Sequence, residues 1–130
     1  GTSMDYTVFV VEDEKVSRKM TIELLKTMGI KKIIVSENGE SALKKLRSQK
    51  ANLIISDWHM PIMSGLELYK TAKKENILKN TPFLMVTVED SKDKVIEALK
   101  LGIRDYIVKP LSKKSFESKV KTMLKADFSS

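Results

Sequence analysis

Residues 52–61 read NLIISDWHMP, a short apolar run that stops at an acidic residue. The run Asn52–Ser56 shows little alternation of polar and apolar residues, which is typical of a strand buried on both faces, as in a parallel sheet. Four more runs of this kind occur along the chain: Thr7–Val11, Lys32–Ser36, Pro82–Thr87 and Asp105–Val108. The sequence therefore predicts five buried strands.

Segments with helical spacing of apolar residues separate these runs. The predicted helices are Glu14–Met28, Gly39–Gln49, Gly65–Glu75, Lys92–Leu101 and Lys113–Lys125. Residues typical of helix ends flank them, such as the capping box of Ser64 with Glu67 and Gly102 after the fourth helix. Strands that alternate with helices predict an α/β fold, a five-stranded parallel sheet that is doubly wound as (βα)5 with helices on both faces.

Polar residues follow several of the strands at the point where each strand ends. Glu12 and Asp13 follow the first strand, Asp57 follows the third, Thr87 ends the fourth and Lys109 follows the fifth. Parallel strands end at the same edge of a sheet, and ligands of doubly wound folds bind at that edge. We expect three carboxylates, a hydroxyl and an ammonium group to converge there, whereas Glu37, after the second strand, is expected at the surface.

Three neighbouring carboxylates repel one another unless a cation or protons intervene. Oxygen ligands of this kind suit Mg²⁺. A divalent metal, a carboxylate nucleophile, a lysine and a threonine together describe a site that accepts a phosphoryl group. In this interpretation one of the aspartates attacks phosphorus and forms an acyl phosphate, while Mg²⁺ and the lysine neutralise the phosphoryl oxygens.

The composition excludes several other classes of site. The chain has 130 residues and no cysteine, which predicts one domain and excludes disulfides, cysteine zinc sites and thiol catalysis. Its single histidine, His59, excludes a site built from several histidines. Its apolar runs are far shorter than the roughly 20 residues of a membrane-spanning helix, and acids such as Asp5 interrupt any secretory signal. We expect a cytoplasmic domain without membrane insertion.

The ends of the chain are expected to lie outside the fold. Gly1–Ser3, before Met4, resembles a cloning scar. The domain is predicted to cover residues 4–126, which leaves residues 127–130 as a tail.

The motifs that carry the chemistry resemble the receiver domain of two-component response regulators. They are Glu12-Asp13, Asp57, Met60-Pro61-Ile62-Met63-Ser64-Gly65, Thr87 and Lys109-Pro110. The resemblance covers essentially all of Met4–Leu124 and is strongest to the CheY type, the single-domain chemotaxis regulators. The resemblance also implies the flavodoxin-like strand order 2-1-3-4-5, which is the known order of the CheY fold.

The resemblance implies roles for the residues of the site. Asp57 is the phosphoacceptor. Asp13, Asp57 and the backbone carbonyl of His59 hold Mg²⁺, and Glu12 acts on the metal through water. Lys109 pairs with the phosphoryl group and precedes a cis peptide bond.

The resemblance also implies a switch. Thr87 hydrogen-bonds the phosphoryl group and draws its loop inward, and Tyr106 then turns from outward to inward. This movement remodels the face formed by the fourth helix, the fifth strand and the fifth helix, as a two-state element biased by a local charge event. Four further residues flank the pocket: Trp58, Val88, Glu89 and Pro110.

The partners follow from the same resemblance. A sensor histidine kinase donates the phosphoryl group, a flagellar motor switch protein or another phospho-dependent target receives the signal, and a phosphatase ends it. The domain catalyses its own phosphotransfer and dephosphorylation but is not a conventional enzyme. The alternative is a receiver domain excised from a larger regulator with a different output, such as DNA binding.

Three positions and the net charge depart from the commonest pattern of the family. Glu12 replaces a more frequent Asp, Val88 stands where a small residue is usual, and Leu111 stands where Phe is common. The formal net charge of +7 is unlike the acidic balance of better-known chemotaxis regulators. A basic charge balance is typical of binding to nucleic acid, to a membrane surface or to an acidic partner, or of a lysine-rich solvated surface alone.

Rival interpretations are weaker. A flavodoxin needs a loop rich in Ser, Thr and Gly after the first strand, whereas Glu12, Asp13 and Glu14 would repel phosphate. A haloacid-dehalogenase phosphatase needs an aspartate two residues after its nucleophile, where this chain has His59. No helix-turn-helix follows the last predicted helix, so binding of nucleic acid by this chain alone is not expected.

Overall fold

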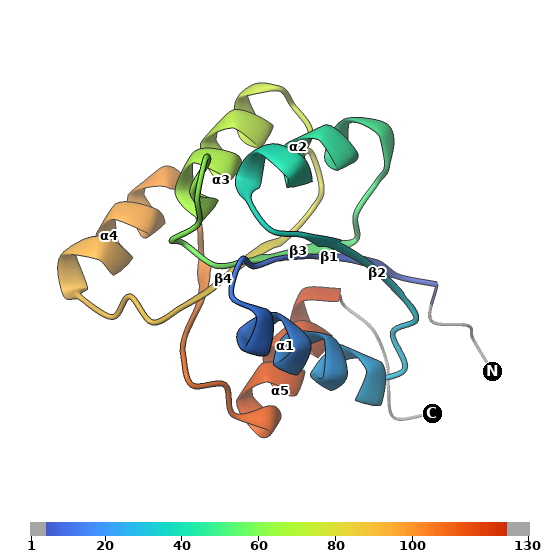
Figure 1. Cartoon of the computed structure of the whole chain (residues 1–130). Helices are drawn as coiled ribbons and strands as arrows, with labels where there is room; N and C mark the ends of the chain where they lie inside the picture. Colours follow the sequence, from blue (N-terminus) through green and yellow to red (C-terminus); the bar gives the residue numbers. More distant parts are fainter. Residues whose placement is uncertain (1–4, 125–130) are drawn as a thin grey trace.

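The computed structural model describes residues 5–124, so the predicted scar and tail lie outside the described residues. Within these residues, five strands and five helices alternate (Figure 1). The strands are β1 (Thr7–Val11), β2 (Lys32–Ser36), β3 (Leu53–Ser56), β4 (Phe83–Thr87) and β5 (Asp105–Val108). The helices are α1 (Lys15–Thr27), α2 (Gly39–Ser48), α3 (Gly65–Lys74), α4 (Lys92–Leu101) and α5 (Lys113–Leu124).

The sheet is parallel throughout, in the order β2-β1-β3-β4-β5, which confirms the expected topology. Its register aligns the strand ends. Val11 pairs with both Ser36 and Ser56, the last residues of β2 and β3, and Thr87 pairs with Val108. The residues that follow Val11 and Ser56 therefore leave neighbouring strands at the same level.

Helices cover both faces of the sheet, with α2, α3 and α4 on one side and α1 and α5 on the other (Figure 1). Successive side chains of a strand point to opposite faces. Phe9 thus joins the core under α2 and α3, and its neighbour Val10 joins the core under α1 and α5. Burial on both faces explains why these strands are apolar without alternation.

The predicted boundaries differ from the observed ones by single residues. Glu14 is the N-cap of α1 rather than its first helical residue, because its carboxylate accepts hydrogen bonds from the backbone N–H groups of Val16 and Ser17. β3 and β4 each begin one residue later than expected. Helices α1, α2 and α3 each end one residue earlier than expected. The predicted last residue of α5, Lys125, lies outside the described residues.

The start of α3 packs directly against the end of β3. A Cβ atom on Gly65 would lie 2.0 Å from the carbonyl oxygen of Asp57, so only glycine fits at this position. The N–H of Gly65 donates to the carbonyl of Trp58 at 2.8 Å. This contact holds the loop after Asp57 close to the sheet edge. Within residues 5–124, no helix has both the length and the apolar character needed to cross a membrane.

Candidate functional site

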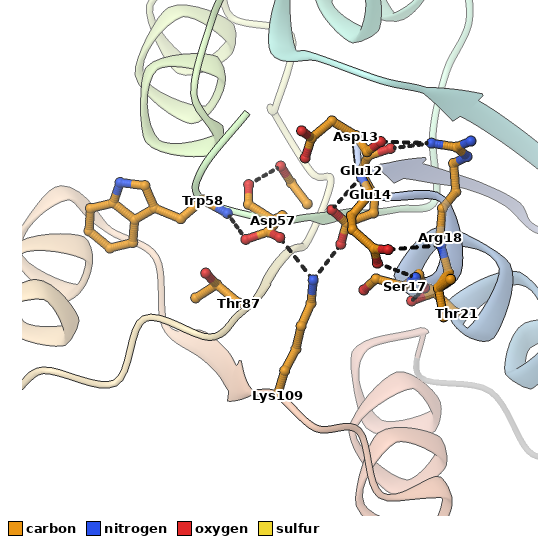
Figure 2. Close-up of polar contacts among 12 residues, drawn as sticks. Glu12, Asp13, Glu14, Ser17, Arg18, Thr21, Asp57, Trp58, Thr87 and Lys109 are labelled. Atoms are coloured by element: carbon orange, nitrogen blue, oxygen red, sulfur yellow. Dashed lines mark hydrogen bonds and ion pairs between the residues drawn. The ribbon is translucent and has the colours of Figure 1, made fainter. Parts of the chain in front are cut away.

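Three of the predicted site residues meet at the carboxyl edge of the sheet (Figure 2). The Lys109 Nζ atom lies 2.5 Å from Oε1 of Glu12 and 2.9 Å from Oδ2 of Asp57. The side chains of Lys109, Glu12 and Asp57 are 14%, 6% and 11% exposed, so little water separates their charges. Two carboxylates thus share one ammonium group in a largely buried cluster.

Asp57 is held as a carboxylate. Burial on its own raises the pKa of Asp57, but hydrogen bonds from Lys109 and Thr87, the charge of Lys109 and the amide of Trp58 outweigh burial, so the pKa is lowered. The N–H of Trp58 donates to Oδ1 at 2.6 Å, while Lys109 binds the other oxygen. Asp57 therefore presents an ionised oxygen at neutral pH, as a nucleophile requires.

Glu12 is the carboxylate that takes up a proton more readily. Burial and the charge of Asp57 raise the pKa of Glu12, and the hydrogen bond from Lys109 offsets this only in part. Burial alone would lower the pKa of Lys109, but its hydrogen bonds to the two carboxylates raise it. Lys109 therefore stays protonated between the two carboxyl groups.

Asp13 does not join this cluster. Its side chain is exposed and points away from Lys109 (Figure 2). In the described part of the chain, no three His, Cys, Asp or Glu side chains lie close enough together to hold a metal ion. The predicted ligands are thus not assembled as a set, although the carboxylates of Glu12, Asp13 and Asp57 and the carbonyl of His59 supply the oxygen donors that Mg²⁺ prefers.

Arg18 fixes the loop that carries the two acids after β1, and sequence reasoning missed it. Its guanidinium NH1 donates to the backbone carbonyls of Glu12 at 2.9 Å and Asp13 at 3.3 Å. The N–H of Glu14 donates to Oε2 of Glu12 at 3.2 Å. The available signal was the position of Arg18, one turn into the helix that follows the acidic pair. The sequence could not show the contact, because the distance from the arginine to these carbonyls depends on the loop conformation.

Tyr106 is directed inward in this structure. Its hydroxyl donates to the carbonyl of Glu89 at 2.7 Å, and its ring meets Trp58 edge-on at 6.5 Å between ring centroids. Burial, followed by the charge of Glu89, raises the pKa of Tyr106 to about 12, so the hydroxyl remains a donor. The Oγ1 atom of Thr87 accepts from the N–H of Glu89 at 3.3 Å. The predicted change of Tyr106 from outward to inward stays a prediction.

The side chain of His59 also has a partner that the sequence did not indicate. Its Nε2 atom lies 2.9 Å from Oε1 of Glu89, which joins the loop after β3 to the loop after β4. His59 stacks on Trp58, and the Lys94 ammonium lies 5.5 Å from the centre of the Trp58 ring. Trp58 is only 5% exposed and packs beside Asp57.

Val88 and Pro110 line a shallow apolar groove beside the cluster. The groove has a volume of about 330 Å³, and its lining includes Lys109 and the exposed side chains of Val16 and Met20. Val88 is 68% exposed and therefore lies on the rim. The Lys109-Pro110 peptide bond is cis, as the resemblance implied. Glu37 is exposed, as expected.

Comparisons with known proteins agree with this geometry. A family model described as "Response regulator receiver domain" matches residues 8–121. The chain is 35% identical to chemotaxis protein CheY1 of Helicobacter pylori, over 90% of this chain and 95% of that protein. The structure of chemotaxis protein CheY4 of Vibrio cholerae is similar, with a TM-score of 0.83 and 29% identity, over 92% of this chain and 98% of that one.

A more distant structure shares the fold. The receiver domain of the sensor histidine kinase PA1611 of Pseudomonas aeruginosa is 17% identical and has a TM-score of 0.85, over 94% of this chain and 99% of that one. That domain was solved with a magnesium ion coordinated in its active-site cleft.

Proposed function

We propose that this chain, which belongs to the response regulator receiver family, accepts a phosphoryl group on Asp57. The observation that carries the proposal is the pairing of Asp57 with Lys109 at 2.9 Å in a largely buried cluster. This contact keeps the carboxylate ionised and places an ammonium group where phosphoryl charge would arrive. The family role is two-component signalling, and the chemotaxis proteins among its relatives support a role in chemotaxis.

The transfer follows from the groups at the site. An Asp57 oxygen attacks the phosphorus of a phosphohistidine on a sensor kinase, and the P–N bond breaks as the new P–O bond forms. The histidine nitrogen leaves with the electron pair of the P–N bond. Lys109 stabilises the phosphoryl oxygens, and the Thr87 hydroxyl donates a hydrogen bond to one of them. Hydrolysis of the acyl phosphate, by this chain or with a phosphatase, ends the signal.

A magnesium ion is part of the proposal. Asp13, Asp57 and the carbonyl of His59 would hold it, with Glu12 acting through water, and the bound ion would neutralise phosphoryl oxygens. The oxygen donors of this chain support this part of the proposal, because Mg²⁺ prefers such ligands. The PA1611 receiver domain, which was solved with magnesium, is 17% identical and shares only the fold.

The proposed output face is formed by α4, β5 and α5. It exposes apolar side chains that a partner would cover, with Leu99 56% and Val108 41% exposed. Tyr106 connects this face to the loop of Thr87 and Glu89. A flagellar motor switch protein is the expected target in the cytoplasm, and a receiver domain of a larger regulator with another output is the alternative.

The direct test is phosphorylation by a small donor. The chain is incubated with acetyl phosphate and Mg²⁺, and intact mass spectrometry should show one added phosphoryl group. Asp57→Asn should show none, whereas Glu37→Gln, an exposed acid at the same sheet edge, should label as the parent does. Equal labelling of Asp57→Asn would sink the assignment.

A further inference from the structure

The bond between Glu12 and Lys109 depends on the length of the Glu12 side chain. Most members of the family have Asp at this position, as the resemblance indicates. The Oε1 atom of Glu12 reaches the Lys109 Nζ atom at 2.5 Å. An Asp side chain is shorter by one carbon–carbon bond, about 1.5 Å, so its oxygen would fall outside hydrogen-bond range without a shift of the loop. The extra methylene is therefore what brings this carboxylate to the lysine.

This bond engages groups that a metal ion would need. Glu12 and Asp57 have only Lys109 as a cationic contact within residues 5–124, because Arg18 donates to backbone carbonyls instead. A divalent cation placed at the same carboxylates would repel the ammonium group of Lys109 and neutralise the oxygens that attract it. Glu12 cannot both keep its close contact with Lys109 and turn toward a hydrated metal ion.

We propose that the Glu12–Lys109 bond competes with binding of Mg²⁺, so that the length of Glu12 sets the magnesium affinity of the site. The inference rests on the proposed function, in which these carboxylates bind Mg²⁺. Glu12 is a positioning residue here, because it acts by holding Lys109. When the Glu12–Lys109 bond breaks, Lys109 gains a free N–H donor for the phosphoryl group. Binding of Mg²⁺ is thereby coupled to the availability of a Lys109 N–H group for the phosphoryl group.

The experiment is a double-mutant cycle on the magnesium affinity of the full chain. Mg²⁺ is titrated against the wild type, Glu12→Asp, Lys109→Met and the double variant, and the fluorescence of Trp58, the only tryptophan, is followed. A charge-assisted hydrogen bond changes an equilibrium constant by roughly tenfold. Glu12→Asp should therefore lower the Kd for Mg²⁺ about tenfold in the wild type, and by less than about twofold in the Lys109→Met background.

Controls make each result decisive. Glu37→Asp, the same chemical change at an exposed position of the same edge, should leave the Kd unchanged. Circular dichroism checks the fold of each variant, and Lys109→Gln replaces Lys109→Met if the latter does not fold. Where the fluorescence does not respond, free Mn²⁺ measured by electron paramagnetic resonance gives the affinities instead.

Two results would overturn the inference. One is an unchanged Kd in Glu12→Asp, and the other is an equal gain in both backgrounds. Failure of the proposed function looks different, because Asp57 would then remain unlabelled by acetyl phosphate while the cycle still showed coupling. A wild type that binds neither Mg²⁺ nor Mn²⁺ would remove both the metal from the proposed function and this inference.

Discussion

Replacing Lys109 by Met removes the ammonium group that lies between two buried carboxylates. Met keeps most of the side-chain volume, so the main loss is the charge. Breaking a buried ion pair on one side costs about 3–5 kcal/mol of folding stability, because a buried charge is left uncompensated. The exposures of 6% for Glu12 and 11% for Asp57 place both acids in this regime.

Protonation of Glu12 sets an upper limit to this cost. The pKa of Glu12 is already raised by burial from an ordinary value of 4.5. Each unit between that value and the solution pH costs about 1.4 kcal/mol. Protonation at pH 7 therefore costs about 3.4 kcal/mol, and protonation at pH 5.5 costs about 1.4 kcal/mol. We expect Lys109→Met to lose about 3 kcal/mol at pH 7 and less than half of that at pH 5.5.

The direction of this pH dependence follows from the difference in pKa between the folded and the unfolded protein. A carboxyl group whose pKa is higher in the folded than in the unfolded protein favours folding below its unfolded pKa, and this contribution is lost as the pH rises through the folded pKa. In Lys109→Met the pKa of Glu12 rises further, so the variant should gain stability relative to the wild type as the pH falls from 7 toward 5. In the wild type the pKa of Asp57 is lowered, so Asp57 remains ionised between pH 7 and pH 5.

Urea unfolding in the presence of EDTA measures both effects, followed by circular dichroism and Trp58 fluorescence. Lys113→Met, at an exposed position at the start of α5, is the matched control and should change stability by no more than about 0.5 kcal/mol. A loss below about 1 kcal/mol at pH 7, or an equal loss at both pH values, would refute the account of the cluster as a buried, mutually dependent set of charges.

Three other positions give shorter tests. Ile62 is 73% exposed and has a φ of +69°, which a β-branched residue rarely adopts. Asn tolerates this backbone conformation, so Ile62→Asn should raise the free energy of unfolding, measured in urea, by about 1 kcal/mol. Ile62→Val, which keeps a β-branched residue, should not. Val88→Ala should speed phosphorylation by acetyl phosphate, dephosphorylation or both severalfold, and unchanged rates would show that the rim does not restrict access. Arg18→Ala should cost about 1–2 kcal/mol of stability and weaken Mg²⁺ binding, whereas Lys19→Ala, exposed beside it, should change neither.

The sequence predicted the sheet well because each of its signals is local. A buried strand such as Asn52–Ser56 is apolar wherever it stands, and the residue after it must lie at the sheet edge. The order of the strands came from the family resemblance instead, because five similar apolar runs do not specify which neighbours pair. The single-residue errors at helix ends have a local cause too, as at Glu14, where a capping carboxylate resembles a first helical residue.

Contacts within the site were harder to predict because they depend on side-chain reach across loops. Sequence placed Glu12, Asp57 and Lys109 at one edge but could not show that one ammonium group would bridge both acids. It also grouped Asp13 with them, although this side chain is exposed in the structure. The contact of His59 with Glu89 joins residues 30 positions apart on two loops, and no periodic pattern encodes such a pair.

The contacts around Glu89 determine how a change at Thr87 would spread. The N–H of Glu89 is bound to the Thr87 hydroxyl, its carbonyl to Tyr106 and its carboxylate to His59. The Thr87 hydroxyl already donates to Asp57. A phosphoryl group on Asp57 would therefore break the 3.3 Å contact with the Glu89 amide only if it moved the Thr87 side chain itself. The other two contacts would still tie Glu89 to β5 and to the loop after β3. The loop after β4 therefore cannot move as a free segment: its displacement must either carry Tyr106 and His59 with it or break one of these two bonds.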